Sequence, residues 1–185
     1  KVLLVDLDPQ ASLTLHAGFE ILNLQHSLAQ VLLSAVRGSP PDTLHQQILQ
    51  TIQPTAIEGL HLLPTNLDLS AVELQLFAAF SRERVLARVL SPLKAHYDDI
   101  LIDCPPALGL FTINALTAAD KLVIPVATDF LSLRGAQLLI DQTLPTIQAH
   151  LNPNLELLAI LPTLFDERTL HARSVLQELR NLYAL

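Results

Sequence analysis

The sequence contains no methionine and no tryptophan, aromatic residues make up only 4% of it, and cysteine occurs once. Because Cys104 is alone, neither an internal disulfide nor a cysteine-bound metal cluster can form. No uninterrupted apolar stretch has the length of a membrane span, and no signal-peptide pattern opens the chain. We therefore expect a cytoplasmic protein with no membrane partner.

Basic residues are also scarce. Eleven Lys and Arg against eighteen Asp and Glu give a formal charge of −7, whereas a domain that binds DNA by itself usually has a basic surface. Arg82, Arg84 and Arg88 form a local cluster with helical spacing. Such a cluster is more often a solvated helix face than a DNA-binding surface.

Hydrophobic residues make up 50% of the 185 residues, which is enough for one substantial core. Strand and helix patterns alternate along the chain, so we expect an α/β fold with a mostly parallel sheet and flanking helices in a single domain, residues 1–185. The expected strands are 2–7, 60–64, 99–103, 121–126 and 157–163, and the expected helical regions are 70–95, 137–150 and 169–183, with two short helices between 18 and 59.

Two aliphatic runs that end in aspartate are the most informative feature. One run leads into Asp6 and Asp8, and the other leads into Asp103. Runs without polar alternation are typical of parallel strands buried on both faces. Ligands of open α/β sheets bind at the carboxyl ends of the strands, so these carboxylates predict a metal and phosphate site. The simpler interpretation of each aspartate is a turn residue.

Several blocks around these runs resemble ParA-type chromosome and plasmid partition ATPases, the family related to the Min-system ATPase and the nitrogenase iron protein. The resemblance covers nearly the whole chain in the family's order. The matching blocks are 2–14, 63–69, 97–110 with its Walker B strand, 114–120, 123–126, 130–135 and 161–169.

The resemblance implies a P-loop NTPase-like fold that hydrolyses ATP with Mg²⁺. In this family, ATP drives formation of a homodimer, and the complete dimer binds DNA non-specifically and so associates with the nucleoid. A ParB-like centromere-binding protein stimulates hydrolysis. The resemblance thus implies an ATPase that segregates or positions DNA or other cargo.

The resemblance also implies roles for single residues. Asp8 matches the aspartate that orients the attacking water, and Asp103 matches the Walker B aspartate, which holds Mg²⁺ through water. Asp6 serves either the metal and nucleotide site or the fold alone. The remaining expected nucleotide contacts are Pro9 and Gln10 beside the γ-phosphate, and Thr163 and Asp166 near the adenine.

One family feature is absent from the 185 residues. No Gly-rich loop ending in Gly-Lys-Thr or Gly-Lys-Ser occurs among the five glycines, so the backbone amides and lysines that cradle phosphate are lacking. The chain starts at Lys1 without a methionine and stops at Leu185 after a helical pattern. We therefore expect a chain truncated at both ends, which alone binds ATP very weakly and is inactive.

Two alternatives remain open at this point. The chain could be a non-catalytic interaction module with the ParA-type fold that lacks the phosphate loop. It could also be a phosphoacceptor receiver domain, in which Lys121 and Thr128 would accompany the acidic strand ends. The seven histidines are scattered without the paired spacing of a zinc site.

The family's sheet makes a last expectation possible. The implied strand order is 60–64, 2–7, 99–103, the P-loop strand, 121–126 and 157–163. Without the P-loop strand, a slot would separate 99–103 from 121–126, or another segment would fill it.

Overall fold

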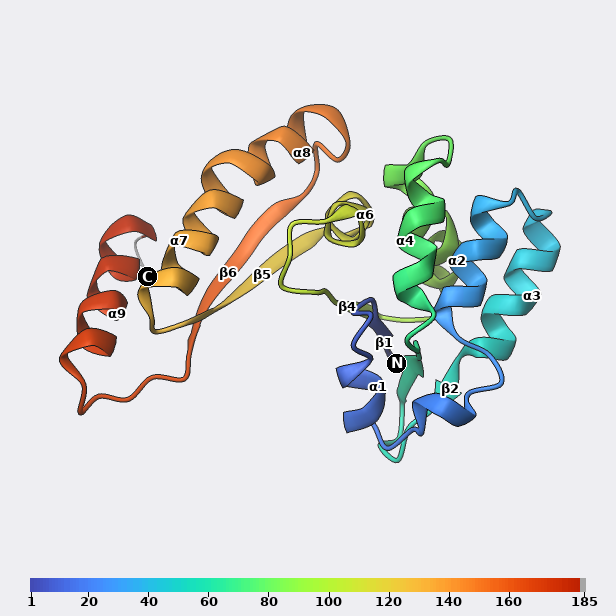
Figure 1. Ribbon diagram of the computed structural model, residues 1–185, viewed down its shortest axis with the longest axis horizontal. Coiled ribbons are helices and arrows are strands. Elements are labelled where there is room, and N and C mark those ends of the chain that lie inside the picture. The colour runs from blue at the N-terminus through green and yellow to red at the C-terminus, as the bar shows by residue number, and fades with distance from the viewer. Residues whose placement is uncertain (184–185) are drawn as a thin grey trace. The chain divides into compact units, whose positions relative to one another are not determined.

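The first aliphatic run forms strand β1 (Val2–Asp6), which lies between two parallel neighbours (Figure 1). The computed structural model describes residues 1–183. β1 pairs with β3 (Leu60–Leu63) and with β4 (Asp99–Asp103), and the short β2 (Gln53–Pro54) runs antiparallel to β3. The order β2-β3-β1-β4 agrees with the implied order of the three parallel strands.

Helices supply most of the core around this sheet. Leu3, Val5 and Leu7 are fully buried and join a cluster with apolar side chains of the helices. The helices are α1 (Ser12–His16), α2 (Leu28–Val36), α3 (Pro41–Thr51), α4 (Leu69–Phe77), α5 (Val85–Leu90) and α6 (Leu110–Ala118), with 3₁₀ turns η1 (Ile21–Asn23), η2 (Arg82–Arg84) and η3 (Ser91–Ala95).

A second sheet contains β5 (Lys121–Ala127) and β6 (Glu156–Thr163), which pair in parallel. Helix α7 packs on β5 and contacts α9 (Figure 1). Ile124, Val126, Leu133, Val175 and Leu179 belong to the buried cluster of this part. Its helical elements are α7 (Phe130–Leu138), the π-turn η4 (Leu139–Thr143), α8 (Leu144–His150) and α9 (Leu170–Tyr183).

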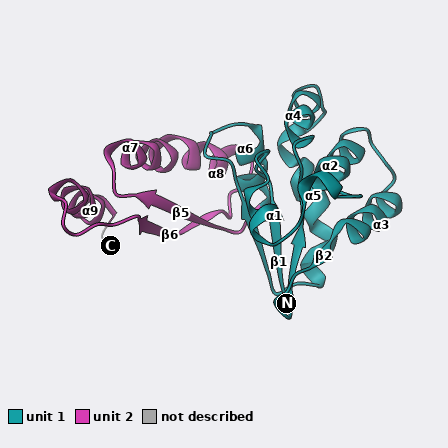
Figure 2. Ribbon diagram, turned by 60° about the horizontal axis from the view of Figure 1, so that its bottom comes forward, with its two compact units in different colours: residues 1–118 teal, residues 119–185 magenta. Residues whose placement is uncertain are grey.

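The chain thus divides into two compact units, residues 1–118 and 119–185 (Figure 2). Each unit has its own sheet and its own buried cluster. That the two units form one domain with a slot between 99–103 and 121–126 stays a prediction. Within the part of the chain that the structure describes, no helix is both long enough and apolar enough to span a bilayer.

Some local predictions were wrong. β1 is buried or half-buried along its length, but β4 is the edge strand of its sheet and leaves Leu101 57% exposed. The helix expected from 137 begins at Phe130, because Asp129 caps it: the Ser132 amide donates to Asp129 Oδ1 over 2.9 Å. Helix α1 was not expected, since five residues are too few for an apolar period.

Candidate functional site

The carboxyl ends of β1 and β4 lie side by side. Asp6 and Asp103 occupy the same register position of the parallel ladder. The pairing continues one step further, because the Leu7 amide donates to the Asp103 carbonyl over 2.9 Å. Asp8 follows in the loop after β1, so the fold brings the three predicted carboxylates to one edge of one sheet.

The Asp6 carboxylate is engaged in the fold. Its side chain is fully buried, and Oδ2 accepts from the Thr14 amide at 2.8 Å and from the Thr14 hydroxyl at 2.6 Å, while Oδ1 accepts from the Asp8 amide at 3.3 Å. The Thr14 hydroxyl accepts in turn from the Thr65 amide at 3.0 Å. Burial raises the pKa of Asp6 above its ordinary value, against the hydrogen bonds from Thr14. Of the two roles expected for Asp6, these contacts favour the fold.

Asp8 lies at the start of the loop that leads into α1. Its Oδ1 accepts from the Gln10 amide at 2.9 Å, and its carbonyl accepts from the Ala11 amide at 2.8 Å, which together close a turn over Pro9. Ala11 then adopts a left-handed backbone with φ of 54° and is fully buried. The turn holds Asp8 half-buried and Gln10 exposed at the sheet edge.

Asp103 is the exposed member of the group. Partial burial raises the pKa of its carboxyl, and the negative charges of Asp6 and Asp8 raise it further. A divalent cation would relieve this repulsion, and carboxylate oxygen is the ligand that Mg²⁺ prefers. The donor chemistry therefore fits Mg²⁺.

The described residues contain no group of three or more His, Cys, Asp or Glu side chains arranged to hold a metal ion. A cation at Asp103 would thus take most of its ligands from water and phosphate, which is how Mg²⁺ usually binds with nucleotides.

The loop after Asp103 is tied to the helical layer. Cys104 packs against the core, and burial raises the pKa of its thiol to about 12, with further contributions from Asp103 and Asp8. Asn114 is a linking residue that sequence reasoning missed. Its Nδ2 donates to the Arg82 carbonyl at 2.9 Å and its Oδ1 accepts from the Leu86 amide at 3.1 Å. The available signal was the one amide side chain inside the largely apolar α6, whose other polar residues are two threonines.

Thr14 was missed as well, and the sequence holds no signal for it, because its partners are distant in the chain. The arginine cluster is partly neutralised: Arg82 Nε donates to Glu83 at 2.9 Å, and its Nη1 donates to the Phe77 carbonyl at 3.1 Å. This agrees with a structural role for Arg82.

Thr163 and Asp166 lie in the second unit, at the carboxyl end of β6. The Thr163 carbonyl accepts from the Thr128 amide at 3.1 Å. Both Asp166 oxygens accept from the Arg168 guanidinium, at 2.9 and 2.8 Å, and this pairing lowers the pKa of Asp166. The predicted residues therefore fall into two groups, one in each unit.

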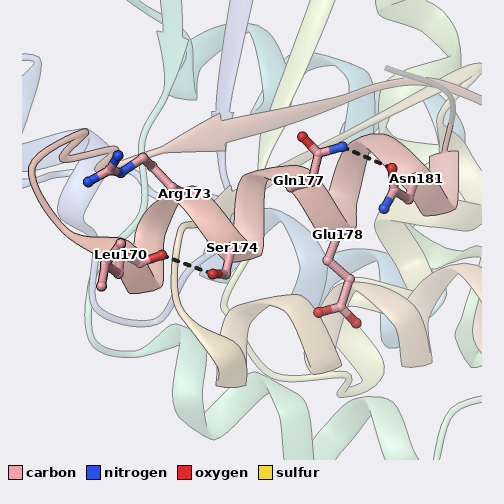
Figure 3. Close-up of a pocket in the computed structure, with 6 residues that line it drawn as sticks. All are labelled: Leu170, Arg173, Ser174, Gln177, Glu178 and Asn181. Atoms are coloured by element: carbon pink, nitrogen blue, oxygen red, sulfur yellow. Dashed lines mark hydrogen bonds between the residues drawn. The ribbon is translucent and has the colours of Figure 1, made fainter.

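A separate hollow of about 510 Å³ lies on α9 (Figure 3). Its lining comes from one helix, on which Ser174 donates to the Leu170 carbonyl and Gln177 donates to Asn181. None of the predicted site residues contributes to it. The hollow is a polar helix face without a convergent set of catalytic groups.

Parallel strands with flanking helices make this an α/β protein, and its similarity to solved structures places the fold in the P-loop NTPase class. The solved structure of cobyrinic acid a,c-diamide synthase from Mycobacterium smegmatis is similar, with a TM-score of 0.85 and 39% identity, over 100% of this chain and 71% of that one. The same protein has been solved with a bound ATP analogue and magnesium.

A family model described as an AAA domain matches residues 1–157. The chain is 36% identical over 183 residues to the sporulation initiation inhibitor protein Soj of Bacillus subtilis, covering 99% of this chain and 68% of Soj. It is also 36% identical over 183 residues to the chromosome partitioning protein ParA of Myxococcus xanthus, covering 99% of this chain and 61% of ParA. The chain therefore belongs to the ParA- and Soj-like family of AAA-type ATPases.

An uncharacterised protein of Mycobacterium tuberculosis is 40% identical over 176 residues, which cover 95% of this chain and 52% of the relative. The chain thus spans between about half and about two thirds of the curated relatives it matches. The family assignment replaces the receiver-domain alternative. Whether the chain is truncated at either end stays a prediction.

Proposed function

We propose that this chain is part of a partition ATPase in which ATP hydrolysis switches dimerisation and DNA binding, and so segregates or positions DNA or other cargo. The observation that carries the proposal is the acidic edge at Asp8 and Asp103 in a chain of the ParA- and Soj-like family. The partition role is supported by two relatives, the chromosome partitioning protein ParA of Myxococcus xanthus and the chromosome-partitioning ATPase Soj of Treponema pallidum.

Asp103 would hold Mg²⁺ through water, and the bound ion would neutralise charge on the phosphates. Asp8 would accept a hydrogen bond from the attacking water and orient it toward the γ-phosphate. Pro9 and Gln10 would shape the loop beside that phosphate, while Asp6 keeps the loop in place through Thr14. Thr163 and Asp166 would contact the adenine.

The partners follow from the family. We expect an ATP-dependent homodimer, stimulated by a ParB-like protein, that binds DNA non-specifically and is cytoplasmic, with nucleoid association when ATP is bound. The net charge of −7 means that residues 1–185 supply little basic surface of their own.

ATP turnover by two proteins tests the proposal. One is the chain of residues 1–185, and the other is the same chain with whatever its gene encodes ahead of Lys1. We expect the short chain to bind ATP more weakly than micromolar, because each missing charge-assisted hydrogen bond contributes roughly 1.5–3 kcal/mol. Mg²⁺-dependent hydrolysis by the extended protein would support the proposal.

The alternative is a non-catalytic interaction module with the ParA-type fold. It is favoured by the lack of any Gly-Lys-Thr or Gly-Lys-Ser sequence in the 185 residues. Absence of turnover and of ATP binding in the extended protein would decide for this alternative.

A further inference from the structure

The short helix that follows the Asp8 loop is held to its sheet by a polar side chain. Of the five residues of α1, all within the part of the chain that the structure describes, Thr14 is the one that is buried. Leu13 is half-buried and Leu15 is 50% exposed, so neither leucine anchors the helix fully. Helices in proteins usually depend on an apolar face for their position. The attachment of α1 to β1 depends instead on the hydrogen bonds of Thr14.

The hydrogen bonds of Thr14 have a fixed direction. Its hydroxyl oxygen accepts from the Thr65 amide, which can only donate, and its hydroxyl proton goes to Asp6 Oδ2, 2.6 Å away. The Thr14 amide donates to the same carboxylate oxygen over 2.8 Å. With Oδ2 held by two donors, the other oxygen of Asp6 accepts from the Asp8 amide at 3.3 Å. A directed chain of hydrogen bonds thus runs from the end of β3, through Thr14 and Asp6, to the backbone of Asp8.

The contact of Asp6 with Thr14 also closes the base of the loop that carries Asp8. Just beyond this base, Asp8 Oδ1 accepts from the Gln10 amide at 2.9 Å, which fixes the side chain and leaves Oδ2 to accept from a water molecule. Two ties therefore act on Asp8. The Gln10 amide orients its carboxylate, and Asp6 holds its backbone in the place that Thr14 sets.

We propose that Thr14 is a positioning residue for ATP hydrolysis, which acts through Asp6 on the Asp8 backbone and so aims Asp8 Oδ2 at the attacking water. The inference rests on the proposed ATPase function and goes beyond a role of Thr14 in the fold. Thr14 takes no part in the bond changes, in which the water oxygen bonds to the γ-phosphorus and ADP leaves. A misplacement of about 1 Å can lower a rate by about 100-fold, so loss of the hydroxyl should slow a protein that is still folded.

Kinetics of the extended protein test the proposal, at a temperature where circular dichroism shows every variant to be folded. Thr14→Val removes the hydroxyl and should lower kcat by roughly 10- to 100-fold, with KM for ATP within about twofold, because Thr14 would touch no nucleotide. Thr14→Ser keeps the hydroxyl and should retain most of kcat. The matched control is Thr51→Val, which should leave kcat unchanged. Thr51 is also fully buried in unit 1, but its hydroxyl donates to the Gln47 carbonyl of its own helix at 2.7 Å.

A double variant shows whether Thr14 acts through Asp8. Asp8→Ala already removes the carboxylate that Thr14 would position, so adding Thr14→Val to it should lower kcat by no more than about a further twofold. Single-turnover measurements on the parent, the two single variants and the double variant complete the cycle. Full multiplication of the two effects would show that Thr14 acts by a different route, and it would overturn the proposal.

Amide hydrogen exchange of the 185-residue chain gives a readout that needs no nucleotide. The Asp8 amide should exchange roughly tenfold faster or more in Thr14→Val than in the parent, and at the parental rate in Thr51→Val. Equal rates in Thr14→Val and the parent would show that Thr14 does not hold the Asp8 backbone, which overturns the proposal.

The remaining outcomes separate this inference from the proposed function. If the extended protein hydrolyses ATP and Thr14→Val is as fast as the parent, the positioning role alone is overturned. A loss in Thr14→Ser as large as in Thr14→Val would also overturn it, because the hydroxyl would not be the acting group. If the extended parent protein shows no turnover, the proposed ATPase function itself fails, and the positioning role is overturned with it.

Discussion

The carboxyl edges of the two sheets differ in how their charges are satisfied. At the edge of the four-stranded sheet, the negative charges of Asp6 and Asp8 add to the effect of burial in raising the pKa of Asp103, and no cation is paired with these carboxylates among the interactions described. At the edge of the two-stranded sheet, Asp166 is neutralised by Arg168, and the Thr128 hydroxyl donates to the Leu164 carbonyl at 3.1 Å. The uncompensated negative charge at the first edge favours binding of Mg²⁺. At the second edge, the carboxylate and hydroxyl are already paired within the protein.

The largest expected effect concerns turnover. In a protein active in ATP hydrolysis, Asp8→Ala should lower kcat by roughly 10²–10⁴-fold, the usual contribution of a positioned acid–base group. ATP binding and dimerisation should change little, because Asp8 would act on the water and not on the bound nucleotide.

Asp103→Ala should instead weaken Mg²⁺-dependent ATP binding. Asp166→Ala, on the second edge, would remove an adenine contact and should raise KM while leaving kcat nearly unchanged. Calorimetry measures ATP binding and steady-state kinetics measures turnover for the three variants. Equal effects of Asp8→Ala and Asp103→Ala on binding and turnover would show that the division of roles is wrong.

Within the first edge, Asp6 should matter most for stability. Asp6→Ala leaves the buried Thr14 amide and hydroxyl without their acceptor, which should lower the free energy of unfolding by about 3 kcal/mol. Asp6→Asn keeps one acceptor oxygen and should cost less. Urea denaturation measures both. The control is Asp166→Ala, where only a solvent-exposed ion pair is lost and little change in the free energy of unfolding is expected.

Thr14→Val tests the middle of the same network. The valine keeps the shape of the side chain but removes the donor to Asp6 and the acceptor for the Thr65 amide. We expect a loss of about 2 kcal/mol in unfolding free energy, since a buried amide is left unpaired. Thr163→Val, at the second edge, should change stability by a smaller amount, and an equal loss there would contradict the contrast between the edges.

The smallest effect should appear in the pH dependence of stability. The pKa of Asp103 is raised above 3.8, so the folded state binds this proton more tightly than the unfolded state does. The resulting contribution to folding stability is fully present below pH 3.8 and is lost as the pH rises through the folded-state pKa. Asp103→Asn should therefore be the more stable protein near pH 7, by less than about 1 kcal/mol because the group is exposed.

This advantage of Asp103→Asn should shrink as the pH falls toward 4, which denaturant titrations between about pH 4 and 7 would follow. A variant that is less stable than the parent at pH 7 would show that Asp103 forms a stabilising contact. Added Mg²⁺ should narrow the difference if Asp103 binds it.

Strand positions were largely predictable, because aliphatic runs such as 2–6 and 99–103 have no competing helical period. Asp8 and Asp103 were placed at one sheet edge by the same reasoning. The role of Asp6 was not decidable, since its partner Thr14 is eight residues away and meets it only through the fold. The start of α7 could have been predicted from Asp129, a typical N-cap residue that accepts a hydrogen bond from the Ser132 amide, but it was missed. The exposure of β4 depends on its edge position, which a local pattern does not encode.

The network of Asp6, Thr14 and Thr65 also has a consequence for how the molecule opens. It joins the end of β1, the start of α1 and the segment after β3, so the Thr14 and Thr65 amides can meet solvent only if all three separate. Their hydrogen exchange should therefore be slow and correlated, close to the rate of global unfolding. The Gln10 amide, held by Asp8 on the exposed turn, should exchange early through local fluctuation. The loop that carries Asp8 is thus anchored at its base and free to adjust at its tip.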